Sequence, residues 1–205
     1  MAARSDVLAV TITADTVALD ADGISVAAAV GNNAALVIGG ALASGGAVAL
    51  SHGRIVTILS AGNDAAKSFT VVGTDINGDA QTESITGANA GTATGAVFFL
   101  SIASITAVGN PAGNVSAGVN TSAADVIFAG RARLKGIYLT STATAGTTDY
   151  LTTSPTGTSL MKLSSVGDAD ATRDVVIPSD GVVFSDGIYI QYTVSTFLTM
   201  TVFHA

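Results

Sequence analysis

The sequence predicts an all-β protein, and three observations carry that prediction. Val, Thr, Ala and Gly dominate the 205 residues, whereas helix-favouring side chains are scarce, with one Glu and three Lys. β-Branched residues occur in short runs, as strands favour. Small polar and glycine-rich segments end these runs at close intervals, which is typical of strands joined by turns. We therefore expect helix in less than about 10% of residues, against a usual share near one third.

Residues 1–122 are predicted to form a smaller β-rich domain, a meander of hairpins. Its strands are expected at 54–59, 67–72, 80–86, 97–100 and 102–108. Residues 23–53 contain no Asp, Glu, Lys or Arg, a length that could span a membrane. Asn and Gly pairs interrupt this stretch and its apolar residues are mostly Ala, so we expect strands with glycine turns and no membrane contact. The alanines leave a short helix within 23–30 as an alternative.

A hairpin turn is predicted at Asn77 and Gly78, between the runs at 67–72 and 80–86. Asn-Gly between β-rich runs favours a two-residue turn in which both central residues have positive φ.

A calcium site is an alternative interpretation of the residues around this turn. Oxygen ligands are offered at alternate positions by Asp75, Asn77, Asp79 and Glu83. An EF-hand loop, however, needs glycine at its sixth position and glutamate at its twelfth, and Ala and Thr stand there. The hairpin explains these residues without a bound ion. Similarly, Asp168, Asp170 and Asp174 are interpreted as a solvated acidic loop.

Residues 123–205 are predicted to form a C-terminal domain with a β-sandwich or jelly-roll-like fold. Most aromatic residues lie in this part, whereas Phe69 is the only Phe or Tyr before Val97. The boundary is expected in the small polar run at 120–125. Strands are expected at 126–129, 133–141, 148–153, 158–163, 172–178, 182–184, 187–194 and 197–203.

Charge and composition argue against several function classes. The net charge is −7, and no excess of Lys and Arg exists to displace counterions from a nucleic acid. The absence of cysteine excludes disulfides and thiolate metal sites. The two histidines, His52 and His204, have no Gly-x-Ser-x-Gly motif to support a catalytic triad. We expect no catalytic residue, no cofactor and no metal.

Arg131, Arg133 and Lys135, which we call the basic stripe, alternate along one predicted strand and so share one face. One interpretation is an exposed edge strand whose charges prevent unwanted pairing. The other is a subunit contact that forms ion pairs with an acidic neighbouring subunit.

Several segments resemble a module of virion structural proteins of tailed bacteriophages. They are GALASGG at 40–46, TILSAGND at 57–64, FTVVGTD at 69–75, QTESITGANAGT at 81–92, GRARLKGIY at 130–138 and IPSDGVVF at 177–184. The resemblance implies a non-enzymatic protein of the phage particle, assembled in the host cytoplasm in many copies. Within that class a capsid decoration or cement protein is favoured, and a tail, adaptor or fibre-base component or a host-surface carbohydrate-binding module are the alternatives.

The expected partners follow from the same resemblance. They are further copies of the chain, as a homo-oligomer and most simply a trimer at the local three-fold positions of a shell, and the major capsid protein or another virion protein. Only 11% of residues are charged, so a free monomer would be poorly solvated, and we expect much of its surface to be covered in an assembly.

Overall fold

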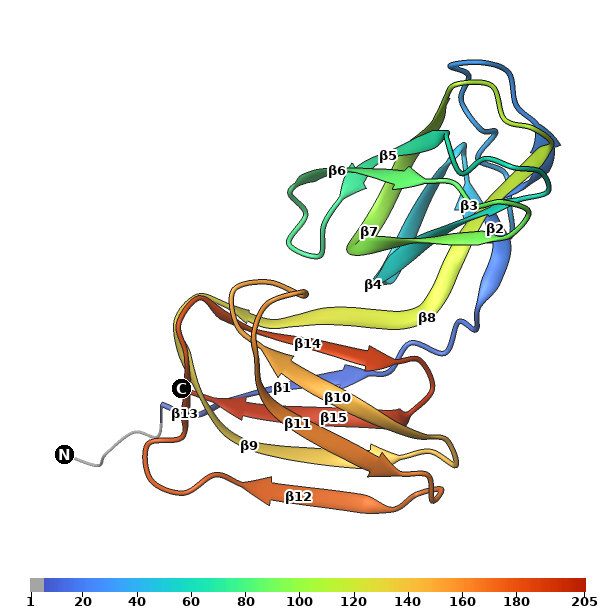
Figure 1. Ribbon diagram of the computed structural model, residues 1–205. Coiled ribbons are helices and arrows are strands. Elements are labelled where there is room, and N and C mark those ends of the chain that lie inside the picture. The colour runs from blue at the N-terminus through green and yellow to red at the C-terminus, as the bar shows by residue number, and fades with distance from the viewer. Residues whose placement is uncertain (1–5) are drawn as a thin grey trace. The chain divides into compact units, whose positions relative to one another are not determined.

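The computed structural model describes residues 6–205, which form fifteen strands and no helix, so the predicted all-β class is confirmed for this part of the chain (Figure 1). The chain divides into two compact units. The middle unit comprises Val17–Ala123, and the sandwich unit comprises Ala124–Ala205 together with the segment that ends at Thr16. Within the described residues, no helix is long and apolar enough to cross a membrane.

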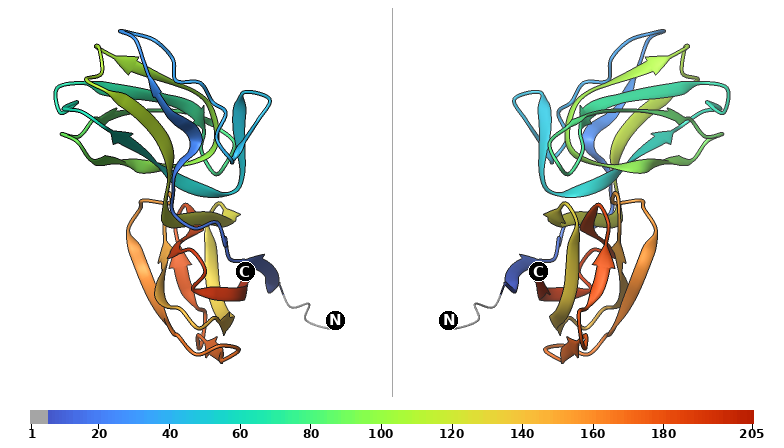
Figure 2. Two further views of the ribbon diagram at one scale, coloured as in Figure 1. Left: turned by 90° about the vertical axis from the view of Figure 1, so that its right-hand side faces the viewer. Right: turned by 90° about the vertical axis from the view of Figure 1, so that its left-hand side faces the viewer.

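The sandwich unit consists of two antiparallel sheets. One has the order β1 (Leu8–Thr13), β15 (Phe197–His204), β9 (Ala132–Ser141), β12 (Thr172–Val176), and β13 (Val182–Phe184) also pairs with β9. The other has the order β11 (Ser159–Val166), β10 (Ala145–Leu151), β14 (Gly187–Thr193), β8 (Asn114–Ala129). Figure 2 shows the two sheets as separate layers.

Contacts across the core hold the two sheets of the sandwich unit together. The hydroxyl of Tyr150 in β10 donates a hydrogen bond to Sδ of Met200 in β15 at 2.8 Å, and both side chains are fully buried. The rings of Tyr192 in β14 and Phe197 in β15 are tilted, with centroids 4.9 Å apart. The aromatic side chains that are concentrated in the C-terminal part of the sequence thus form the core between the two sheets.

The N-terminal strand β1 does not belong to the middle unit, which differs from the predicted division at residue 122. It pairs with β15 along its whole length, from Leu8 opposite His204 to Thr13 opposite Thr199. Its partner lies about 190 positions away along the chain, so no local pattern could reveal this pairing. The expected boundary at 120–125 is also strand, because β8 continues through it from one unit into the other.

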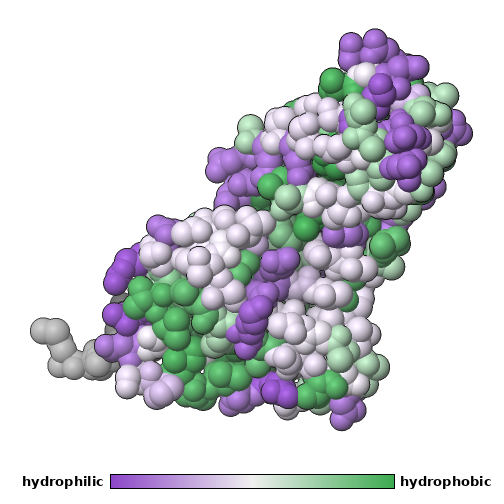
Figure 3. All heavy atoms as spheres, in the orientation of Figure 1, coloured by the Kyte–Doolittle hydropathy of each residue, from purple (hydrophilic) through white to green (hydrophobic). Residues whose placement is uncertain are grey.

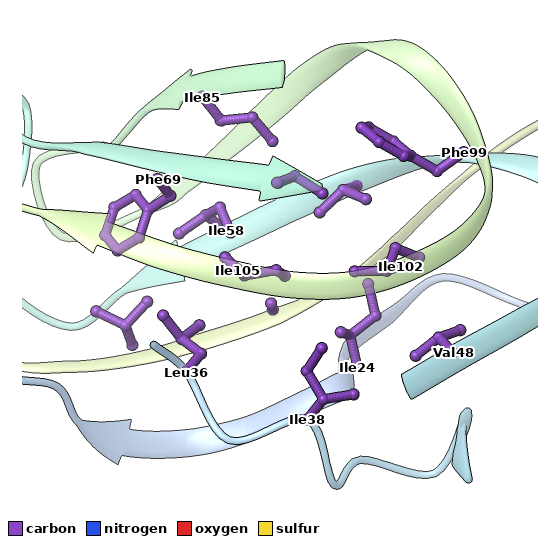
Figure 4. Packing of buried hydrophobic residues seen from close by; sticks show 14 of the residues in the cluster. Ile24, Leu36, Ile38, Val48, Ile58, Phe69, Ile85, Phe99, Ile102 and Ile105 are labelled. Atoms are coloured by element: carbon purple, nitrogen blue, oxygen red, sulfur yellow. The ribbon is translucent and has the colours of Figure 1, made fainter. Parts of the chain in front are cut away.

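The middle unit is built around a sheet of long strands. Its order is β8, β4 (Ala47–Ser60), β7 (Thr92–Val108), β5 (Ser68–Thr74), β6 (Ala80–Thr86), with β2 (Asp20–Ala29) on β8 and β3 (Ala43–Ser44) on β4. The charge-free residues 23–53 thus contribute strands and turns, and the short helix considered at 23–30 is replaced by β2. Figure 4 shows the apolar core, which includes Ile24, Val48, Ile58, Phe69, Ile85, Phe99, Ile102 and Ile105.

Two side chains of β6 bind the backbone of β7 beyond the sheet ladder. Gln81 donates from Nε2 to the carbonyl of Phe98 at 2.7 Å, and Glu83 accepts from the N–H of Ala96 at 2.5 Å. The first half of β7 pairs with β4 and the second half with β5. The two side chains therefore bind backbone groups of β7 in the part of the strand that β5 does not cover, the carbonyl of the buried Phe98 and the N–H of the exposed Ala96.

The β5–β6 hairpin has a longer turn than predicted. Five residues, 75–79, join the strands, and the N–H of Gly78 donates to the carbonyl of Asp75 at 3.1 Å. Gly78 has a φ of +87°, but Asn77 does not have a positive φ, so the turn is not the two-residue turn expected at these positions. The bonds match a three-residue hairpin loop in which only its last residue, Gly78, needs a positive φ. The carboxylate of Asp75 stabilises this loop by accepting hydrogen bonds from the N–H groups of Asn77 and Asp79.

Candidate interaction surface

The basic stripe lies on the outer side of the sandwich unit. Arg131 is exposed in the connection before β9, and Arg133 and Lys135 are half-buried within β9. Ala132 and Leu134, which alternate with them, are buried. The three cations therefore point away from the core while their neighbours pack into it, as the period of a strand requires.

The strand that carries the stripe is not a free edge, so the interpretation of the stripe as edge protection is wrong. β9 has β15 on one side and β12 and β13 on the other. At Arg133 both sides are occupied, because Val183 is its register partner in β13 and its N–H donates to the carbonyl of Ala205 at 2.7 Å. The local sequence of β9 shows that its charges alternate, but it does not show which strands lie beside it. Those strands, β12, β13 and β15, come later in the chain.

A turn at 178–181 interrupts the strands beside the stripe. β12 ends and β13 begins on either side of it, and the N–H of Ile177 donates to the carbonyl of Lys135 at 2.9 Å. Gly181 has a φ of +78°, and a Cβ at this position would lie 2.3 Å from the carbonyl oxygen of Leu134. Only glycine fits this close approach. The segments 130–138 and 177–184 thus form one local structure.

Two of the three cations bind the carbonyls of this turn. Nη1 of Arg133 donates to the carbonyl of Asp180 at 3.3 Å, and Nζ of Lys135 donates to the carbonyl of Ser179 at 3.3 Å. Each side chain keeps further N–H donors, since a guanidinium has five and an ammonium three. The stripe is held in place from one side and remains able to bind an anion from the other.

No carboxylate within residues 6–205 forms an ion pair with Arg131, Arg133 or Lys135. By contrast, Lys162 in the same unit is paired with Asp149, with 3.3 Å between Nζ and Oδ1. Lys67 and Arg173 likewise form no ion pair within the described residues, so what distinguishes the stripe is that three cations lie together on one side of the sandwich unit. The arrangement is suited to binding carboxylates on another molecule.

The acidic residues considered for calcium are engaged by the backbone. The carboxylate of Asp75 accepts hydrogen bonds from the N–H groups of Asn77 at 2.8 Å and of Asp79 at 2.9 Å. Glu83 points to β7 instead, as described above. In the described part of the chain, no three His, Cys, Asp or Glu side chains are close enough to hold a metal together.

The histidines lie in different units, His52 in β4 and His204 in β15. His204 is buried, and its ring lies 5.0 Å from that of Phe128. Burial disfavours the charged imidazolium and lowers the pKa of His204 from its usual value of 6.5. Its ring packs against Phe128.

Three buried charged residues, Asp15, Arg54 and Asp64, were not singled out by the sequence. Arg54 is fully buried in β4 and donates from Nη2 to the carbonyl of Asn120. Asp64 is fully buried and accepts a hydrogen bond from the N–H of Ala112 at 2.7 Å. Asp64 is the last residue of the segment TILSAGND at 57–64, and its position there was the one signal available in the sequence. Nothing in the local sequence distinguishes Arg54 from an exposed strand arginine.

Comparison of the chain with protein-family models, curated proteins and solved structures finds no match.

Proposed function

We propose that the chain is a non-enzymatic structural protein of a tailed-bacteriophage virion, and that it acts as a capsid decoration or cement protein. The observation that carries this proposal is the basic stripe, in which Arg133 and Lys135 in β9 and Arg131 just before it lie together and have no carboxylate partner within the described residues. Acidic side chains of a neighbouring subunit would complete these interactions. The resemblance of the same segments to phage virion proteins supports this assignment.

The surface of the sandwich unit supports burial in an assembly. Large apolar side chains are exposed there, among them Val176 at 76% and Leu160 at 42%. Figure 3 shows apolar side chains gathered on one face of this unit. Exposed apolar patches of this kind mark surfaces that contact other molecules. The proposed partners are further copies of the chain, with a trimer as the simplest form, and the major capsid protein or another virion protein.

The proposal is tested by locating the chain in the particle. Virions would be purified from the phage that encodes the chain, and its copy number measured by quantitative mass spectrometry. An electron-microscopy map of the same particles would then locate the two units. Many copies on the capsid shell are expected. Density for the chain in the tail, adaptor or fibre base would instead establish the alternative structural role, and a chain absent from purified virions would overturn the proposal.

A host-surface carbohydrate-binding module is kept as a second candidate because of one observation. Tyr138 is 43% exposed on β9, and its register partners are Thr201 in β15 and Asp174 in β12. An aromatic ring between a hydroxyl and a carboxylate could bind a sugar ring. Binding to a glycan array that Tyr138→Ala abolishes would favour this candidate, and an array without signal would remove it.

A further inference from the structure

The edges of the two sheets differ in how they are protected. The five-stranded sheet ends in β1 and β12, and the ten-stranded sheet, which continues through β8 from one unit into the other, ends in β11 and β6. Beside these orders, β2, β3 and β13 each pair with a single strand. Three of the four end strands carry charged side chains: Arg173 and Asp174 in β12, Lys162 in β11 and Glu83 in β6. Charges on edge strands hinder pairing with other chains, although the carboxylate of Glu83 is bound to the backbone of β7 and does not point to the open edge.

β1 is the exception among these four strands. Its six residues, Leu8–Thr13, include no charged side chain. It pairs with β15 in unbroken register, without a bulge that would twist the edge away. Figure 2 shows β1 at the margin of the sandwich unit. An uncharged edge strand in regular register is a site where another strand can add to a sheet.

The unpaired backbone groups of β1 can be assigned from the register. The N–H of Ala14 donates to the carbonyl of Leu198, which continues the β1–β15 ladder by one step. Hydrogen-bonded and non-bonded positions alternate in an antiparallel ladder. The groups that face away from β15 therefore belong to Ala9, Thr11 and Thr13. These are the donors and acceptors that a further strand would meet.

The side chains of β1 add an apolar contribution to this edge. Leu8 is 59% exposed, and Val10 and Ile12 are only half-buried at the rim of the core. A strand added beside β1 would cover part of their apolar surface, which favours the pairing. The edge thus offers backbone pairing and apolar burial together.

We propose that β1 pairs with β1 of a second copy of the chain, antiparallel and around a two-fold axis. Two copies with a net charge of −7 each repel one another, so contact is least costly through a segment that has no charge. A two-fold pair of identical uncharged strands brings no like charges together, and every residue of one strand meets its counterpart twice. This inference rests on the self-association that the proposed function assumes.

A contact of this size is weak in isolation and effective in an array. Six residues of strand span about 20 Å. Pairing over this length buries less surface area than a stable protein interface usually does. On a particle, however, copies are already held close together, and the effective concentration makes weak contacts bind. The contact is two-fold, so a trimer would need another surface for its own closure.

The test uses full-length variants in sedimentation velocity over a wide concentration range. Wild type is expected to dimerise with rising concentration. Thr11→Lys and Thr11→Asp should each raise the dimer dissociation constant about tenfold or more, because each places like charges on both strands of the pair. An equimolar mixture of the two variants should recover dimers at low salt and lose them at high salt. Thr172→Lys, at the other end of the same sheet, is the matched control and should behave as wild type.

A second variant excludes misfolding as the cause. Thr11→Pro removes an N–H that faces away from β15, so the fold loses no ladder hydrogen bond while the edge loses a donor. It should keep the circular dichroism spectrum and be monomeric. The proposal is overturned if wild type stays monomeric at all concentrations. It is also overturned if Thr11→Lys dimerises as tightly as wild type. If β1-dependent dimers form and the chain is absent from virions, the inference stands and the proposed function fails.

Discussion

Lys135 donates a hydrogen bond from Nζ to the backbone carbonyl of Ser179 at 3.3 Å, so a turn 44 residues away fixes the direction of this cation. Arg133 makes the corresponding bond to Asp180. The two side chains are therefore oriented before any partner arrives, which lowers the entropy lost on binding. A stripe of this kind is better suited to setting the register of a contact than to stabilising the free chain.

Replacement of all three stripe residues by Ser should weaken assembly and leave the fold intact. The intramolecular bonds are partly exposed and lie at the long end of hydrogen-bond geometry, so the free energy of unfolding should fall by less than about 2 kcal/mol. Attachment to particles that lack the chain should weaken, and the difference from wild type should shrink as salt is raised. Urea unfolding and a particle-binding assay at several salt concentrations measure the two effects.

The matched control removes the same number of cations elsewhere. Lys67, Lys162 and Arg173 are replaced by Ser, which gives the same net charge as the stripe variant. If the two triple variants bind particles with the same affinity as each other, any loss of binding relative to wild type comes from the net charge, and the stripe is not a contact.

Substitution of Gly78 should destabilise the fold because of its backbone conformation and not because of steric contacts. A Cβ at Gly78 would meet no atom within 4 Å, so space is not limiting, but its φ of +87° is strained for other residues. Gly78→Ala should lower the free energy of unfolding by about 1 kcal/mol, and Gly78→Asn by less, because Asn tolerates positive φ. Gly39→Ala, without a positive φ and with ordinary contacts, is the control. Equal stability of Gly78→Ala and wild type would contradict the positive φ at Gly78.

Asp64 should be important for the stability of the middle unit. Its Oδ1 accepts the hydrogen bond from the N–H of Ala112, and its buried Oδ2 has no hydrogen-bond partner. Asp64→Ala leaves that N–H unsatisfied and should cost about 1–3 kcal/mol. Asp64→Asn keeps the accepting oxygen and removes the buried charge, so it should be the less destabilising change. Chemical denaturation distinguishes the two, and the reverse order would show that the carboxylate charge itself is stabilising.

Local patterns predicted the strands whose partners are neighbours in sequence. β5 and β6 lie within a residue or two of the runs expected at 67–72 and 80–86, because β-branched runs and turn residues there are unambiguous. β7 was expected as two strands separated at Ser101. It is one strand of 17 residues, in which the hydroxyl of Ser101 bonds to that of Thr74 at 2.7 Å. A polar residue that finds a partner does not end a strand.

Features that depend on distant segments could not be predicted. The alternation of the basic stripe was visible in the sequence, but its place between β15 and the β12–β13 pair depends on residues more than 35 positions away. The same holds for β1, whose pairing with β15 joins the two ends of the described chain. Period-two patterns show which side chains share a face, and they carry no information about which strand lies alongside.

The buried imidazole of His204 predicts a loss of stability in mild acid. Its pKa is lowered by burial in the folded protein and is near 6.5 in the unfolded chain. As the pH falls below about 6.5, the unfolded chain therefore binds a proton that the folded chain does not. The free energy of unfolding should decrease over this range and level off below the folded pKa.

His204→Gln should remove this part of the pH dependence, because glutamine does not titrate. Urea unfolding of wild type and variant between pH 7.5 and 5.5 measures the difference, in which the contribution of His52 cancels since both proteins contain it. The variant will be less stable at pH 7.5 through altered packing against Phe128, and the gap to wild type should narrow as the pH falls. A gap that stays constant across this range would show that His204 titrates equally in the folded and unfolded chains.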